Sequence, residues 1–149
     1  TPAPTETPFP YTPTPIPPSP TPEPTYVTGV ELEMPDDFFS PGEEVYLMAY
    51  IMSGEPAVMT NVPFVCVLDV GVGVYWFYPG WEPYPPTFDY ESITLTPGME
   101  TKSVLGTFTW PETGNDTFTG AIFLSAMLNE DMTDLFGTMG MVEFGWGPN

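Results

Sequence analysis

The sequence predicts an all-β fold, an immunoglobulin-like β-sandwich that follows an N-terminal extended polyproline-II arm. From Tyr26 onward, short runs of β-branched and aromatic residues alternate with Pro, Gly and Asp turn signals about every ten residues, which is typical of sandwiches. Residues 1–25 contain eleven prolines and cannot build a core. We therefore divide the chain into an arm, 1–25, and one sandwich domain, 26–149.

Eight segments of the domain have the composition of strands. They are 27–34, 44–52, 62–70, 72–78, 90–96, 102–110, 117–128 and 139–144. Turns are expected at Ser40-Pro41-Gly42, Pro79-Gly80, Thr96-Pro97-Gly98 and Thr113-Gly114-Asn115-Asp116. One short helix is predicted over 130–136, with Asn129 as its N-cap, Gly137 at its end and Met132, Leu135 and Phe136 packed inward.

Two of these strands, 45–52 and 118–128, are apolar on both alternating faces. A sandwich strand needs only one apolar face, because its other face normally meets water. We therefore expect the arm or a neighbouring subunit to cover the second face. In 45–52 that face carries Tyr46, Met48 and Tyr50, which we interpret as subunit contacts.

The arm is rich in Thr-Pro steps, which favour polyproline II geometry, rising about 3.1 Å per residue. Its exposed hydroxyls indicate an O-glycosylated stalk, although a bare spacer is the alternative. The expected acceptors are Thr1, Thr5, Thr7, Thr12, Thr14, Ser19, Thr21 and Thr25. Phe9, Tyr11 and Ile16 are unusual in a pure spacer and are expected to contact another subunit.

The charge balance excludes several classes of function. The formal net charge is −19, with Lys102 as the single basic residue and no His. Nucleic acid is not expected as a partner, because phosphate contacts need Lys and Arg. Membrane insertion is not expected either, since no run of 18 apolar residues occurs. Because the chain has no His, histidine-dependent catalysis and histidine-ligated metal sites are not expected. Lys102 is expected at the exposed start of a strand.

We expect no enzymatic activity, no cofactor and no metal site. Glu82, Asp89 and Glu91 could formally supply the two carboxylates of a glycosidase, but so small a sandwich lacks the long loops of a catalytic cleft. Asp36-Asp37 and Asn129-Glu130-Asp131 with Asp134 are acidic enough for calcium binding, which is the alternative; no EF-hand spacing appears, so solvated acidic loops are the favoured interpretation. Cys66 lies in an apolar strand pattern and is expected to be a small buried residue.

The densest aromatic cluster is the segment 75–84. One interpretation is a platform of Trp76, Trp81 and Tyr84 on which sugar rings stack. The favoured interpretation is structural: some of these rings alternate into the core and the others seal a subunit interface.

Three stretches, 74–81, 108–114 and 126–128, resemble an uncharacterised module of bacterial secreted and cell-surface proteins that follows Thr/Pro-rich stalks. The run Phe39–Leu47 and the later Thr96-Pro97-Gly98 turn resemble those of immunoglobulin-like bacterial surface domains. The arm is similar to Thr/Pro segments of glycan-coated extracellular filaments. The resemblance implies location and architecture and carries no assigned activity.

Together these observations predict an extracellular, bacterial cell-surface structural protein. Its expected partner is itself, as a homopolymer in which the arm docks on neighbouring subunits and carries covalent glycans. The alternative is a carbohydrate-binding or adhesion module on a Thr/Pro stalk.

Overall fold

The computed structural model describes residues 1–5, 8–20 and 25–148, and all regular structure within these ranges is β. The strands are β1 (Gly29–Glu33), β2 (Phe38–Phe39), β3 (Glu44–Ser53), β4 (Met59–Asp69), β5 (Tyr75–Phe77), β6 (Glu82–Tyr84), β7 (Glu91–Leu95), β8 (Gly98–Thr109), β9 (Phe118–Met127) and β10 (Gly140–Trp146). In the same ranges no helix has the length and apolar character of a membrane span. The all-β prediction is confirmed.

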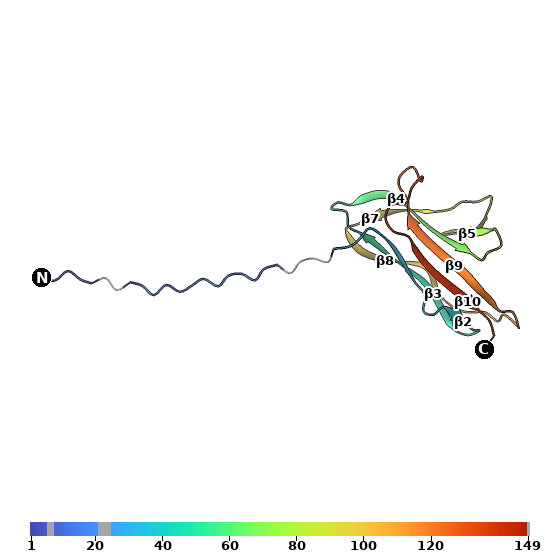
Figure 1. Cartoon of the computed structure of the whole chain (residues 1–149), viewed down its shortest axis with the longest axis horizontal. Coiled ribbons are helices and arrows are strands. Elements are labelled where there is room, and N and C mark those ends of the chain that lie inside the picture. The colour runs from blue at the N-terminus through green and yellow to red at the C-terminus, as the bar shows by residue number, and fades with distance from the viewer. Residues whose placement is uncertain (6–7, 21–24, 149) are drawn as a thin grey trace.

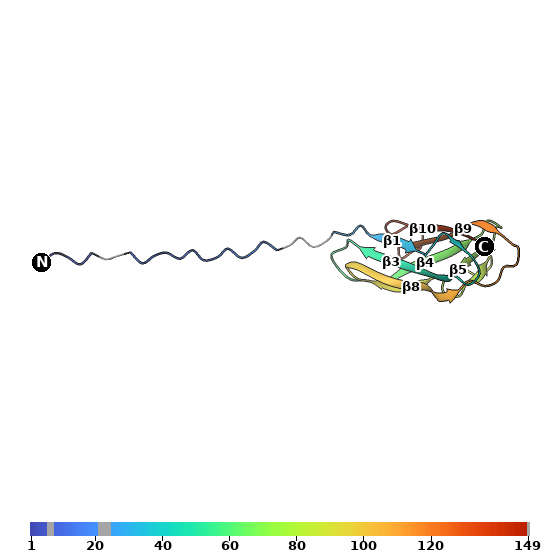
Figure 2. The same ribbon diagram turned by 90° about the horizontal axis from the view of Figure 1, so that it is seen from below.

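The strands form two sheets that face each other (Figures 1 and 2). The small sheet has the order β1-β3-β8, and the large sheet has the order β2-β10-β9-β4-β5-β6, with β7 also paired to β4. The sets β1-β3-β8 and β10-β9-β4 have the order A-B-E and G-F-C of immunoglobulin domains. The predicted immunoglobulin-like sandwich is therefore present.

The core lies between the two sheets and follows the two-residue period of each strand. In β3, Val45, Leu47, Ala49 and Ile51 are buried while the residues between them are half-buried. On the facing strand β4, Phe64 and Cys66 are fully buried. Alternation therefore separates an inner face, which forms the core, from an outer face on each sheet.

All eight predicted strands are observed, with shifted ends. The strands β2 and β6 were not predicted, since β2 has two residues and β6 has Pro83 at its centre. Turns are present at Ser40-Pro41-Gly42, Pro79-Gly80 and Thr113-Gly114-Asn115-Asp116, whereas at Thr96-Pro97-Gly98 the chain only bends at Pro97 and Gly98 begins β8. Gly42 (φ 91°) and Gly114 (φ 64°) adopt left-handed geometry that other residues disfavour.

The predicted helix over 130–136 is wrong. The segment folds as a loop whose ends are tied by a bridge between Leu128 and Leu135. The Asn129 side chain accepts hydrogen bonds from the backbone N–H groups of Thr133 and Asp134, a local pattern that competes with helix formation. Leu135 is consequently 55% exposed instead of packed inward.

The described parts of the arm, 1–5 and 8–20, contain no strand or helix and run as an extended chain outside the sandwich (Figure 1). Phe9, Tyr11 and Ile16 are each about nine-tenths exposed. Two predicted acceptors, Thr7 and Thr21, lie outside the described residues, and the other six are exposed. The arm therefore offers its apolar side chains to solvent in a single copy of the chain.

Candidate functional site

An apolar cavity of about 340 Å³ opens where the edges of the two sheets separate. It is lined by Leu68, Val70, Trp76, Trp81, Leu105 and Phe123. Leu105 comes from β8, at the edge of the small sheet; Val70 directly follows β4, and the others come from β4, β5, β9 and the turn after β5. No acidic side chain is among them, although the chain has 20 acidic residues.

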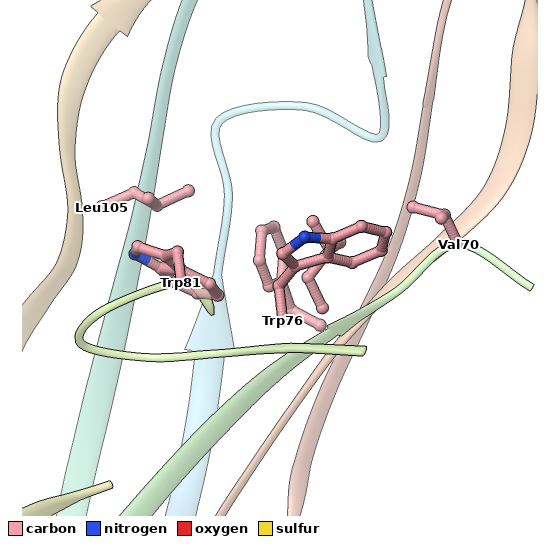
Figure 3. A pocket seen from close by; sticks show the side chains of 6 residues that line it. Val70, Trp76, Trp81 and Leu105 are labelled. Carbon is pink, nitrogen blue, oxygen red and sulfur yellow. The ribbon is translucent and has the colours of Figure 1, made fainter. Parts of the chain in front are cut away.

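The two tryptophans reach this cavity by different routes. Trp76 is the central residue of β5, paired with Pro83 of β6, and alternation turns its ring to the face opposite that of Tyr75 and Phe77. Trp81 lies in the turn between β5 and β6. Figure 3 shows Trp81 between Leu105 and Trp76, with Val70 beyond Trp76.

The turn that carries Trp81 is held in a strained conformation. Trp81 has φ of 55°, a left-handed geometry that is rare for an aromatic residue. Its backbone N–H donates to the carbonyl of Phe77 over 2.7 Å, and its ring packs edge-on against Tyr78 and Phe123, both 5.9 Å away between centroids. Such strain persists only where surrounding contacts hold it, and it is often found at binding sites.

Tyr84, the third residue of the sequence-predicted platform, lies away from the two tryptophans. It packs edge-on against Phe77, 5.6 Å between centroids, on the outer side of β5 and β6. Phe77 also contacts Phe88, which contacts Tyr90, so Tyr84 belongs to an outer aromatic cluster. The structure thus brings Trp76 and Trp81 together and separates them from Tyr84.

A charged cluster closes the sheet edges near the cavity. Lys102 of β8 forms an ion pair with Glu91 of β7, with 2.5 Å between Nζ and Oε2, and Tyr78 donates its hydroxyl to the same oxygen over 2.9 Å. The ammonium also lies 5.5 Å from the centroid of the Tyr78 ring and 6.0 Å from that of the Phe64 ring.

Lys102 is paired with Ala49, so it points between the sheets, and its side chain is 22% exposed. The expectation of an exposed Lys102 is wrong.

The protonation of this cluster follows from its contacts. Burial favours the neutral form of Glu91, but the Lys102 ammonium and the Tyr78 hydroxyl outweigh it and hold the pKa of Glu91 below its ordinary value. Burial likewise opposes the charge on Lys102, but Glu91 and Tyr78 raise its pKa above the ordinary value. Glu91 is therefore an ionised ion-pair partner at neutral pH and not a proton donor.

The outer face of the small sheet is covered by polar groups. Tyr46 and Tyr50, two of the sequence-predicted subunit contacts, both donate their hydroxyls to Glu33 of β1. Met48, the third, lies between Glu33 and Ser103 in the strand register. These three side chains are half-buried by their own neighbours in the sheet.

The outer face of the large sheet is apolar around Leu124 and Ala126, as predicted for 118–128, whereas Ile122 further along β9 lies between Asp69 and Glu143. A groove of about 200 Å³ runs over it, and we call this the outer groove. It is lined by Val65, Val67, Phe88, Leu124, Ser125, Ala126, Leu128, Leu135 and Met139. Phe88, Leu135 and Met139 are 44%, 55% and 51% exposed and were not predicted from sequence as surface contacts. For the part of the groove on β4, the sequence did contain a signal: Val65 and Val67 alternate with the buried Phe64 and Cys66, which places these two valines on the outer face.

The other candidate residues have structural contacts. Asp89 accepts hydrogen bonds from the backbone of Gly80 and Tyr90, which holds the turn before Trp81, and Glu82 is exposed. Cys66 is fully buried, and burial is the largest cause that raises the pKa of its thiol to about 12. Among residues 1–5, 8–20 and 25–148, no three Cys, Asp or Glu side chains gather as a metal site would require.

No family model and no curated protein matches the sequence. The structure is similar to the CARDB domain of the PF1109 protein from Pyrococcus furiosus, described in complex with di-metal ions, at a TM-score of 0.41 and 13% identity over 81% of this chain and 87% of that one.

It is also similar to Spo0M, a sporulation control protein from Bacillus subtilis, at a TM-score of 0.40 and 16% identity over 82% of this chain. The chain spans 50% of that protein's length. Neither similarity is strong enough to assign a function.

Proposed function

We propose that the protein is an extracellular structural subunit of a bacterial surface filament or coat, which self-assembles and carries glycans on its arm. The observation that supports this most is the outer groove. It places eight apolar side chains on the solvent side of a sheet, where a lone sandwich would carry polar ones. Association of copies would remove these side chains from water.

The charge of the chain supports an apolar contact. Copies with a formal charge of −19 repel one another, and the single basic residue is already paired with Glu91. Ion pairs between copies therefore cannot hold an assembly together. Apolar surfaces without acidic residues, such as the outer groove, are the remaining means of self-association.

The arm supports the extracellular part of the proposal. Its described Thr and Ser hydroxyls are exposed, as acceptors of O-linked sugars must be, and its composition is that of a glycosylated stalk. The intact mass of the native protein tests this directly. A mass equal to that of the bare chain would reject glycosylation and would leave the arm as a spacer.

Self-assembly is tested by electron microscopy and sedimentation of the purified chain over a range of concentration and salt. We expect ordered assemblies that form more readily at 0.5 M than at about 0.02 M NaCl, because salt screens the repulsion between copies. The variant Met139→Asp places a charge in the outer groove at an exposed position and should prevent assembly.

The matched control for Met139→Asp is Thr101→Asp, which adds the same charge to the outer face of the small sheet. It should assemble like the unchanged chain. Monomers at every concentration and salt level, or equal effects of the two variants, would reject assembly through the outer groove.

Carbohydrate binding is the second candidate. It is supported by the position of Trp76 and Trp81 side by side at one cavity. Sugar sites also need polar groups that recognise hydroxyls, and the lining has none besides the indole N–H groups. Glycan-array binding that is lost on Trp81→Ala in a folded variant would favour this function over assembly.

A further inference from the structure

The cavity lined by Trp76 and Trp81 is apolar, and its chemistry restricts what could fill it. Its volume of about 340 Å³ is about twice the cavity that holds one benzene ring in an engineered protein core. It therefore has room for an aromatic ring and an adjoining proline. Its lining has no acidic side chain and no cation, so a charged ligand would lose its hydration without a partner.

The arm contains a segment that matches this chemistry. Residues 8–20 have no charged side chain, whereas the chain as a whole has 20 acidic residues. The segment holds seven prolines together with Phe9, Tyr11 and Ile16, which are 96%, 88% and 91% exposed. Proline-rich segments in polyproline II geometry bind aromatic-lined grooves, because they lose little conformational entropy on docking.

We infer that residues 8–20 of one copy dock into the Trp76–Trp81 cavity of a second copy, with Phe9 or Tyr11 as the inserted ring. This inference rests on the proposed self-assembly and names its arm-binding site. It is separate from the outer groove, which lies on the opposite face of the large sheet.

The direction of the chain favours a second copy over the same one. The arm leaves the sandwich at the end of β3, where Gly54 donates a hydrogen bond to Thr28. Leu105 of the cavity is paired with Leu47, seven residues back along β3, which is about 23 Å. Because β1 is antiparallel to β3, the arm continues away from Leu47, and a proline-rich rod resists the reversal that docking on its own domain would need.

The test titrates a synthetic peptide of residues 8–20 into the full chain whose own arm carries Phe9→Ser, Tyr11→Ser and Ile16→Ser. The peptide contains no tryptophan, and two of the four tryptophans of the chain line the cavity, so their fluorescence reports docking. We expect saturable binding. A peptide with the same three Ser substitutions should bind at least about tenfold more weakly, because the apolar contacts are lost.

Two protein variants locate the binding. Trp76→Ala should weaken binding of the peptide at least about tenfold. Val70→Asp, which adds a charge at the cavity, should weaken it by a similar factor. Calorimetry measures both, and Val70→Asp keeps all four tryptophans. Tyr84→Ala is the matched control, since it removes a 39% exposed aromatic side chain from the other face of the β5–β6 pair and should leave binding unchanged. Thermal melting checks that each variant is folded.

The outcomes separate this inference from the proposed function. No binding at millimolar peptide, or equal binding by the unchanged domain and by both cavity variants, would overturn the docking site even if the chain assembles. Peptide binding by the cavity, when the unchanged chain stays monomeric at every concentration, would keep the cavity as a site for this segment but would overturn docking on a second copy together with self-assembly. A tryptophan shift that depends on the chain's own arm but not on protein concentration would show docking within one copy and would overturn the second copy as the source.

Discussion

The outer faces of the two sheets differ in the neighbours that surround the outward-facing side chains of their apolar strands. In the small sheet, the outer side chains of β3 lie between Glu31 and Glu33 of β1 and Thr101 and Ser103 of β8. In the large sheet, Leu124 of β9 lies between Val67 of β4 and Met141 of β10. At these positions the first face has polar neighbours and the second is apolar across three strands, although Met52 pairs with Met99 on the first face and Asp69 and Glu143 flank Ile122 on the second.

This difference shows that an apolar second face on one strand does not by itself indicate an interface. The strands β3 and β9 have similar patterns, but Tyr46 and Tyr50 of β3 satisfy their hydroxyls on Glu33 and are half-buried within the sheet. The residues around β9 include Leu135 and Met139, which remain exposed. The large sheet is therefore the better candidate for contact with another copy.

The largest effect on stability should come from a substitution in the core, which lies between the two sheets. Phe64 is fully buried between the sheets, and Phe64→Ala should lower the free energy of unfolding by about 3–5 kcal/mol. Thermal or urea unfolding measures this loss. Val72→Ala, at a 65% exposed loop position, should change stability by less than about 0.5 kcal/mol, and comparable losses would contradict the placement of the core.

The difference between the two outer faces can be tested by making the outer face of the small sheet more apolar. Glu33→Leu removes a carboxylate and the acceptor of both tyrosine hydroxyls. We expect this variant to self-associate at about tenfold lower concentration, or through a new contact visible by electron microscopy. Glu112→Leu, which removes the same charge in an exposed loop, is the control, and an equal response to both would mean that net charge alone decides association.

The ion pair that joins the sheet edges should have a smaller effect. Lys102→Met should destabilise the fold at pH 7 by about 1 kcal/mol or less, because Glu91 is partly exposed. The pKa of Glu91 is lowered by folding, so its contribution is complete above its ordinary pKa and is lost as pH falls through the lowered value. The stability difference between the two proteins should therefore shrink as pH falls below the ordinary pKa of a glutamate, whereas a difference that does not depend on pH would reflect packing alone.

The smallest expected effect is on the titration of Tyr50. The hydrogen bond to Glu33, with burial and the charge of Glu33 adding to it, raises the pKa of Tyr50 above its ordinary value. Glu33→Gln should lower that pKa toward the ordinary value, as measured by tyrosine absorbance against pH. Met139→Asp, on the other sheet, should leave it unchanged, and a shift in that variant would mean that the two faces are coupled.

Much of the fold could be predicted from sequence because the domain has clear period-two patterns and turn signals. Alternation located eight strands, and Gly42 and Gly114 marked two turns correctly. The helix over 130–136 was wrong because the Asn129 side chain caps a loop closed by the Leu128–Leu135 bridge, and seven residues give little gain from helix propagation.

The candidate site was only partly predictable. The aromatic segment 75–84 drew attention to Trp76, Trp81 and Tyr84, but strand pairing places Tyr84 on the outer side with Phe77. Leu105 and Phe123, which complete the cavity, come from strands far away in sequence. Lys102 appeared exposed in its local context, and only the facing strand β7 supplies its partner Glu91.

The sequence by itself determined the all-β class, the proline-rich composition of residues 1–25 and the strongly acidic net charge of the chain. These follow from local conformational preference and total charge, which do not depend on what lies opposite each strand. Only the tertiary structure decided which apolar face stays open, where the tryptophan cavity lies and how Lys102 is paired. Those features depend on strand register and sheet packing, which bring together side chains that are distant in the chain.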